Sequence, residues 1–86
     1  MINKSLITGA GGFIGANLAR TLLKRGDEVF ALIRPGGDTW RLAEIANDIK
    51  IIEVDIADKE VLEKAVKEIK PEFVFHLAHY GGNRGQ

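Results

Sequence analysis

Residues 8–15 read Thr-Gly-Ala-Gly-Gly-Phe-Ile-Gly, and this stretch decides the fold. An apolar segment precedes it and an amphipathic segment follows it, which predicts a strand, a glycine turn and a helix. Gly9 permits the tight turn, Gly12 lets the backbone approach a diphosphate, and Gly15 lets the helix pack closely. The start of a helix also favours an anion. We therefore predict that a dinucleotide diphosphate binds at Gly9, Gly11, Gly12, Phe13, Ile14 and Gly15.

The rest of the chain alternates between strand and helix patterns. Strands are expected over residues 4–8, 28–34, 50–54 and 72–77, and helices over residues 12–25, 39–47 and 59–70. This alternation predicts an α/β fold, a Rossmann-like parallel sheet in the order 3-2-1-4 with flanking helices, which is half of a doubly wound fold. In the first helix we expect Ile14, Leu18, Thr21 and Leu22 to face the core, and Asp58 to cap the third. A turn without a ligand is the alternative for the glycine stretch, but the following strands and helices disfavour it.

Composition sets the broad class of the protein. The 86 residues are 45% hydrophobic and 28% charged, which is typical of a globular domain, and the formal net charge is zero. We expect no nucleic-acid partner from that charge, and no membrane partner because no apolar run is long enough to cross a bilayer. Cysteine is absent and the N-terminus lacks a signal-peptide pattern, so the expected compartment is cytoplasmic.

The end of the second predicted strand bears on the choice of dinucleotide. An acidic residue there would accept hydrogen bonds from the adenosine ribose and repel a 2′-phosphate. This chain has Arg34 instead, with no acid before Asp38. Since a guanidinium pairs with phosphate, Arg34 favours NADP over NAD. The alternative is that Arg34 stacks on the adenine of either cofactor.

Two further strand ends supply the remaining predicted cofactor contacts. Asp55 and the backbone of Ile56 are placed to meet the adenine amine, although Asp55 could instead only cap the following turn. After the fourth strand we expect contacts from Leu77, Ala78 and His79, because the small Ala78 lets a ribose or nicotinamide lie close. His76 is expected to be buried and hydrogen-bonded. It does not pair with His79 on a metal, since positions three apart on a strand face opposite sides.

These motifs resemble those of the extended short-chain dehydrogenases/reductases, the NAD-dependent epimerase/dehydratase group. The resemblance rests on residues 8–15, on Asp55-Ile56 and on His76-Leu77-Ala78, and it covers essentially the whole chain. Arg34-Pro35 followed by Trp40-Arg41-Leu42 is similar to members that act on nucleoside-diphosphate sugars. The resemblance implies bound NAD(P) and hydride transfer at a sugar hydroxyl or ketone.

The same resemblance implies that this chain is the N-terminal, cofactor-binding part of a truncated Rossmann domain, residues 1–86. The family's acid/base pair is Tyr-x-x-x-Lys, whereas Tyr80 here is followed four residues later by Arg84. We therefore assign no catalytic residue and expect the chain alone to be inactive. An open edge on the fourth strand predicts a homodimer. The alternatives are a dinucleotide-binding sensor module without catalysis and a reductase of a non-sugar carbonyl.

Overall fold

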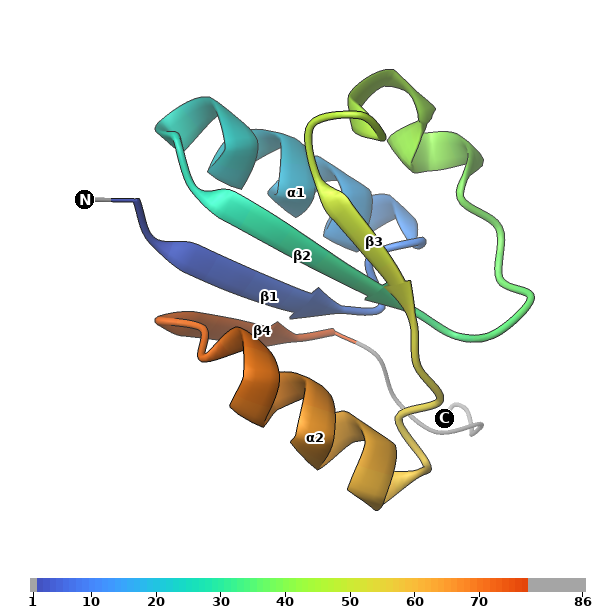
Figure 1. The fold of residues 1–86 in the computed structure, drawn as a ribbon. Helices are drawn as coiled ribbons and strands as arrows, with labels where there is room; N and C mark the ends of the chain where they lie inside the picture. Colours follow the sequence, from blue (N-terminus) through green and yellow to red (C-terminus); the bar gives the residue numbers. More distant parts are fainter. Residues whose placement is uncertain (1, 78–86) are drawn as a thin grey trace.

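The structure is a computed structural model that describes residues 2–77. Its centre is a parallel sheet in the order β3-β2-β1-β4, which confirms the predicted α/β fold and strand order (Figure 1). The strands are β1 (Lys4–Thr8), β2 (Glu28–Ile33), β3 (Lys50–Glu53) and β4 (Phe73–His76). Each strand begins and ends within one residue of its expected position. The carboxyl ends of all four strands therefore meet at one edge of the sheet.

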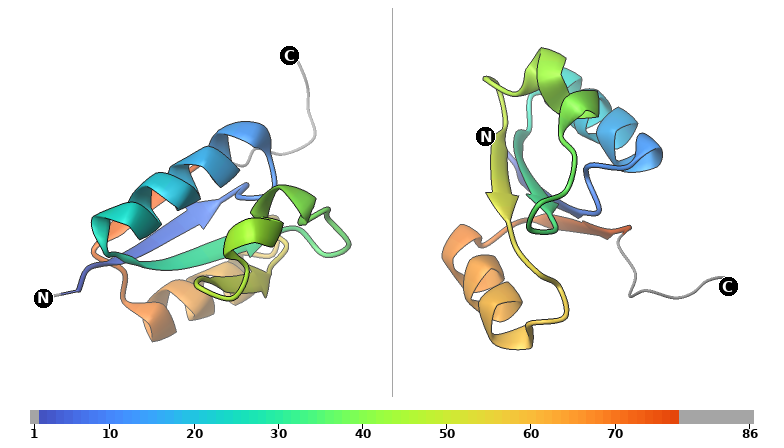
Figure 2. Two further views of the ribbon diagram at one scale, coloured as in Figure 1. Left: turned by 90° about the horizontal axis from the view of Figure 1, so that it is seen from above. Right: turned by 90° about the vertical axis from the view of Figure 1, so that its right-hand side faces the viewer.

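Helices cover both faces of this sheet (Figure 2). One face carries α1 (Phe13–Arg25) and the 3-10 helix η1 (Trp40–Ile45), and the other carries α2 (Lys59–Ile69). Side chains of β2 alternate between the two cores, as the pleat of a strand requires. Val29, Ala31 and Ile33 enter the core beneath α1, while Phe30 and Leu32 enter the core beneath α2. No helix within residues 2–77 has the length and apolarity needed to span a bilayer.

The buried face of α1 differs from the expected one. Its buried residues are Gly15, Ala16, Ala19 and Leu22. Leu22 was expected there and Leu18 packs against the same core, but Thr21 is exposed and Ile14 is 70% exposed. The prediction for Ile14 and Thr21 is therefore wrong. Small side chains, rather than the larger periodic ones, line the closest approach of this helix to the sheet.

Of two further predictions about helical segments, one is confirmed and the other is only partly correct. Asp58 Oδ1 accepts a hydrogen bond from the Val61 N–H at 3.3 Å, which confirms the predicted cap of α2. The segment expected as a helix over residues 39–47 is instead the short 3-10 helix η1, in which only Leu42 is buried. Trp40 is 65% exposed, and η1 packs on the core through Leu42 and the partly buried Ile45.

Strand β4 lies at the edge of the sheet and, within residues 2–77, pairs only with β1. Phe73 and Val74 are 43% and 51% exposed, so the predicted open edge is confirmed, while the homodimer stays a prediction. His76 Nδ1 lies 3.0 Å from Thr8 Oγ1, which confirms the predicted hydrogen bond. The expected burial of His76 is wrong, because its side chain is exposed among the residues that the structure describes.

A buried carboxylate lies at the amino ends of the strands, at the end of the sheet away from the carboxyl ends. Asp27 accepts hydrogen bonds from Ser5 Oγ at 2.6 Å and from Arg25 Nε at 3.0 Å and Nη2 at 2.5 Å. The Arg25 guanidinium also lies 5.3 Å from the centre of the Phe73 ring. The hydrogen bonds from Arg25, followed by the one from Ser5, lower the pKa of the Asp27 carboxyl. This cluster joins the end of α1 to the beginnings of β1 and β4.

The lowered pKa of Asp27 predicts a loss of stability in acid. Because the carboxyl has a lower pKa in the folded chain than in the unfolded chain, its contribution is complete above the ordinary value of 3.8. That contribution is lost as the pH falls through the folded value. We expect Asp27→Asn to be less stable near neutral pH and to lose less stability than the wild-type chain upon acidification. Urea unfolding at several pH values measures both, with the exposed Asp48→Asn as control. Parallel pH profiles for Asp27→Asn and wild type would contradict the prediction.

Candidate functional site

The turn between β1 and α1 forms a backbone cradle at the carboxyl edge of the sheet. Gly9 adopts a left-handed conformation with φ of 71°, which confirms its predicted role in the tight turn. The Gly12 N–H donates to the Gly9 carbonyl at 3.2 Å, and α1 begins at Phe13. Gly12 is the N-cap residue and offers no side-chain acceptor to the first N–H groups of the helix. These groups lack partners within the helix, so the cradle suits an anion.

The other two glycines of the motif have different neighbours. A Cβ atom on Gly15 would lie 2.8 Å from Ala10 Cα and closer still to the Gly9 carbonyl oxygen. Gly15 therefore permits close packing, as predicted, but against the backbone of the turn. Among residues 2–77, a Cβ atom on Gly12 would meet only the Gly9 oxygen, at an ordinary 3.6 Å. The packing of these residues therefore does not require a glycine at position 12.

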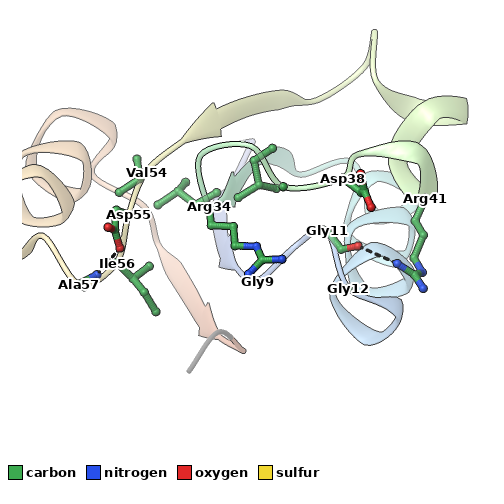
Figure 3. A pocket seen from close by; sticks show the side chains of 13 residues that line it. Gly9, Gly11, Gly12, Arg34, Asp38, Arg41, Val54, Asp55, Ile56 and Ala57 are labelled. Atoms are coloured by element: carbon green, nitrogen blue, oxygen red, sulfur yellow. Dashed lines mark hydrogen bonds between the residues drawn. The ribbon is translucent and has the colours of Figure 1, made fainter. Parts of the chain in front are cut away.

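A cavity of about 540 Å³ opens beside this cradle (Figure 3). It lies at the carboxyl ends of β1, β2 and β3, where ligands bind in open α/β sheets. Of the twelve predicted cofactor-binding residues, six line it: Gly9, Gly11, Gly12, Arg34, Asp55 and Ile56. Residues that lie far apart in the sequence thus meet at a single site, as the sequence motifs predict.

Four of the other six predicted residues are described by the structure and do not line the cavity. Phe13 and Ile14 are 71% and 70% exposed on the first turn of α1, outside the cavity lining. Gly15 is buried against the turn. Leu77 is 37% exposed after β4, and its N–H donates to the Thr8 carbonyl. Ala78 and His79 lie outside the described residues. All twelve cofactor contacts stay predictions.

Asp55 has the structural role that was its alternative interpretation. Its Oδ1 accepts a hydrogen bond from the Ala57 N–H at 3.0 Å, and its carbonyl accepts one from the Asp58 N–H at 2.8 Å. The side chain therefore caps the turn that leads into α2. It also lines the cavity, so the turn holds this carboxylate in place at the wall.

The loop between β2 and η1 and the start of η1 supply wall residues that the sequence did not single out. Gly37, Asp38 and Arg41 all line the cavity. A Cβ atom on Gly37 would lie 3.1 Å from Arg34 Cγ, so this glycine makes room for the Arg34 side chain to run along the loop. The cavity wall thus carries two arginines and two aspartates, counting Asp55. Arg41 could not be assigned from sequence because its position depends on the path of the loop.

Comparison with known proteins places this chain in a family. The family model described as the NAD dependent epimerase/dehydratase family matches residues 5–86. The UDP-glucose 4-epimerase of Mycolicibacterium smegmatis is 37% identical over 78 residues, which are 87% of this chain and 25% of that protein. The chain spans about a quarter of the length of the curated relatives it matches.

Solved structures share the fold. An epimerase from Methanothermobacter thermautotrophicus matches with a TM-score of 0.79 and 36% identity, over 95% of this chain and 24% of that one. An enzyme from Bordetella bronchiseptica, solved in complex with NAD and UDP, matches with a TM-score of 0.79 and 29% identity, over 99% of this chain and 27% of that one. With a family model matching residues 5–86 and this shared fold, the chain belongs to the NAD dependent epimerase/dehydratase family.

Proposed function

We propose that the chain binds a nicotinamide dinucleotide and forms the cofactor-binding part of an enzyme that acts on a nucleoside-diphosphate sugar. The observation that carries the proposal is Gly12. Its position faces open space at the start of α1, where a diphosphate would receive backbone N–H groups. The fold does not need this glycine, whereas a diphosphate seated on the turn does.

The cavity beside the turn suits the adenosine half of such a cofactor. Its volume of about 540 Å³ lies within the range typical of small-molecule sites. Leu32, Ile33 and Val54 give the cavity an apolar part of its lining, and charged side chains also line it. An adenine ring would lie between the ends of β2 and β3, within reach of Asp55 and the Ile56 backbone.

The substrate class rests on the relatives. One is a UDP-glucose 4-epimerase and a structural neighbour was solved with NAD and UDP, so a sugar nucleotide fits the same family role here. When bound, a nicotinamide dinucleotide would supply hydride chemistry: its oxidised form would take a hydride from the carbon that bears a sugar hydroxyl, and its reduced form would give one to a ketone carbon. The residues of this chain would hold that cofactor, and the acid/base residues for the substrate would lie outside residues 1–86.

We propose NADP as the preferred cofactor, supported by Arg34 at the end of β2. The Arg34 side chain lies at the wall of the cavity, and the Gly37 N–H donates to its carbonyl at 2.9 Å (Figure 3). Removing its charge-assisted hydrogen bonds to a 2′-phosphate is expected to lower NADPH affinity about 10-fold to 100-fold, with NADH affinity nearly unchanged. Calorimetric titration of wild type and Arg34→Ala with NADPH and NADH measures this difference.

Two controls make the titration decisive. Lys67→Ala removes a positive charge from α2, away from the cavity, and is expected to bind both cofactors like wild type. Circular dichroism shows whether each chain is folded. A folded wild-type chain that binds neither cofactor would overturn the dinucleotide proposal. Equal weakening of NADPH and NADH by Arg34→Ala would show that Arg34 stacks on adenine, and the NADP preference would fail.

A further inference from the structure

A second hollow in the surface lies between α1 and η1, and it shares no lining residue with the cavity at the glycine turn. The two helices lie side by side on one face of the sheet (Figure 2). Since η1 is only six residues long, it covers part of the side of α1 that it faces and leaves a space of about 590 Å³. We call this space the α1–η1 groove; it is lined by residues between Asn17 and Lys24 of α1 and by Glu44 and Ile45 of η1.

The two walls of the α1–η1 groove carry opposite charges. Arg20 and Lys24 stand on the α1 wall, and Glu44 stands on the η1 wall. Arg20 Nη2 lies 3.4 Å from Glu44 Oε1, so these two residues are level with each other along the groove. Lys24 lies one helical turn further along, about 6 Å away, and forms no ion pair within residues 2–77. The Glu44 side chain is 82% exposed, which leaves most of it open to a second cation.

The groove between these charged walls is apolar or uncharged. Leu23 and Ile45 are partly buried, pack against the core beneath α1 and line the groove. Thr21 Oγ1 donates a hydrogen bond to the Asn17 carbonyl at 3.1 Å, and Asn17 Oδ1 lies 3.4 Å from Arg20 Nη1. These polar side chains therefore have partners in their own chain. An apolar centre with charged groups at its margins is the composition of a protein–protein interface.

We propose that the α1–η1 groove is the interface between two copies of this chain. A two-fold axis along the groove places the α1 wall of each copy against the η1 wall of the other. Lys24 then faces Glu44 of the partner subunit, and the same ion pair forms twice around a shared apolar centre. A groove with walls of one sign would repel its own copy, whereas walls of opposite sign are complementary to themselves. This inference does not depend on the proposed dinucleotide function.

The dimer is expected to be weak and sensitive to salt. The groove is short, and exposed ion pairs contribute little, so we expect a Kd on the order of 100 µM for the 86-residue chain. Added salt screens the two ion pairs and should weaken the dimer further. This interface differs from the homodimer predicted at the open edge of β4, because no residue of β4 lines the groove.

The test exchanges charges between the two walls and measures self-association by analytical ultracentrifugation. In the dimer, Lys24→Glu places two carboxylates opposite each other and Glu44→Lys places two ammonium groups opposite each other. Each variant alone is expected to associate about tenfold more weakly than wild type. An equimolar mixture of the two is expected to associate as strongly as wild type, because every facing pair then has opposite charges. Lys67→Glu makes the same charge change on α2 and should leave association unchanged.

Three results would overturn the proposal, with circular dichroism showing that each chain is folded. The first is a wild-type chain that stays monomeric up to about 1 mM. The second is a mixture of the two variants that associates no better than either alone. The third concerns Val74→Lys, which adds a charge to the open edge of β4 and should not change association. If Val74→Lys abolishes association and Lys24→Glu does not, the dimer forms at β4 and the groove is not its interface.

Discussion

Gly12→Asp is expected to abolish dinucleotide binding while leaving the fold as stable as wild type, or more stable. Gly12 has φ of −80° and ψ of 174°, a conformation open to any residue, and within residues 2–77 its Cβ position meets a single atom, at 3.6 Å. Aspartate is among the best N-cap residues, and α1 has neither a side-chain cap nor an acid in its first turn. The same carboxylate would occupy and repel a diphosphate. We expect more than about a 100-fold loss of affinity for NADPH and NADH.

For Gly12→Asp, we expect cofactor affinity to fall without a fall in stability, so the two quantities are measured separately. Thermal unfolding followed by circular dichroism measures stability, and calorimetric titration measures affinity. Asn17→Asp adds the same charge one turn later on an exposed side of α1 and keeps an oxygen for Arg20, so its binding should stay near that of wild type. Retention of either cofactor by Gly12→Asp would mean that no diphosphate sits on the glycine turn.

Gly15→Ala is expected to destabilise the chain by about 3 kcal/mol, against the direction of helix propensity. Alanine is favoured over glycine inside a helix by about 1 kcal/mol, so propensity alone predicts a more stable chain. Here the added Cβ would lie 2.8 Å from Ala10 Cα, and the obstacle is backbone that cannot rotate aside. Since a domain of this size has only a small margin of stability, part of the population should unfold near room temperature.

Gly12→Ala is the matched control for Gly15→Ala. It makes the same chemical change three residues earlier, where the new Cβ atom has room, and is expected to lower the free energy of unfolding by no more than about 1 kcal/mol. Urea unfolding of the three chains measures both values. Equal destabilisation by the two substitutions would contradict the assigned packing role of Gly15.

The strand order and the glycine turn could be predicted because each has a local cause. Continuous apolar runs and helix periodicity mark parallel strands and their crossovers, and the spacing of Gly9, Gly12 and Gly15 places a turn before a helix. Arg34 and Asp55 could be placed at the cavity because Arg34 directly follows β2 and Asp55 lies two residues after the end of β3. A residue at a strand end has its position fixed by the sheet.

The predictions that failed concern features that are determined by tertiary contacts rather than by the local sequence. Periodicity placed Ile14 in the core, but α1 approaches the sheet through Gly15, Ala16 and Ala19, and that close approach leaves the first turn outside. Arg41 lies eight residues beyond the end of β2, and its place depends on a loop whose path no local pattern specifies. The exposure of His76 depends on which elements cover β4, a property of the whole sheet.

The position of β1 between β2 and β4 has a consequence for how the chain folds. Pairing of β1 with β2 needs only a short crossover, whereas Ser5 pairs with Phe73, which lies 68 positions further along the chain. Such a contact carries a large loop-closure cost and forms late, so it slows folding more than the small size of the chain suggests. During synthesis, the first strand leaves the ribosome long before its second neighbour exists, and one of its edges waits unpaired until translation passes β4.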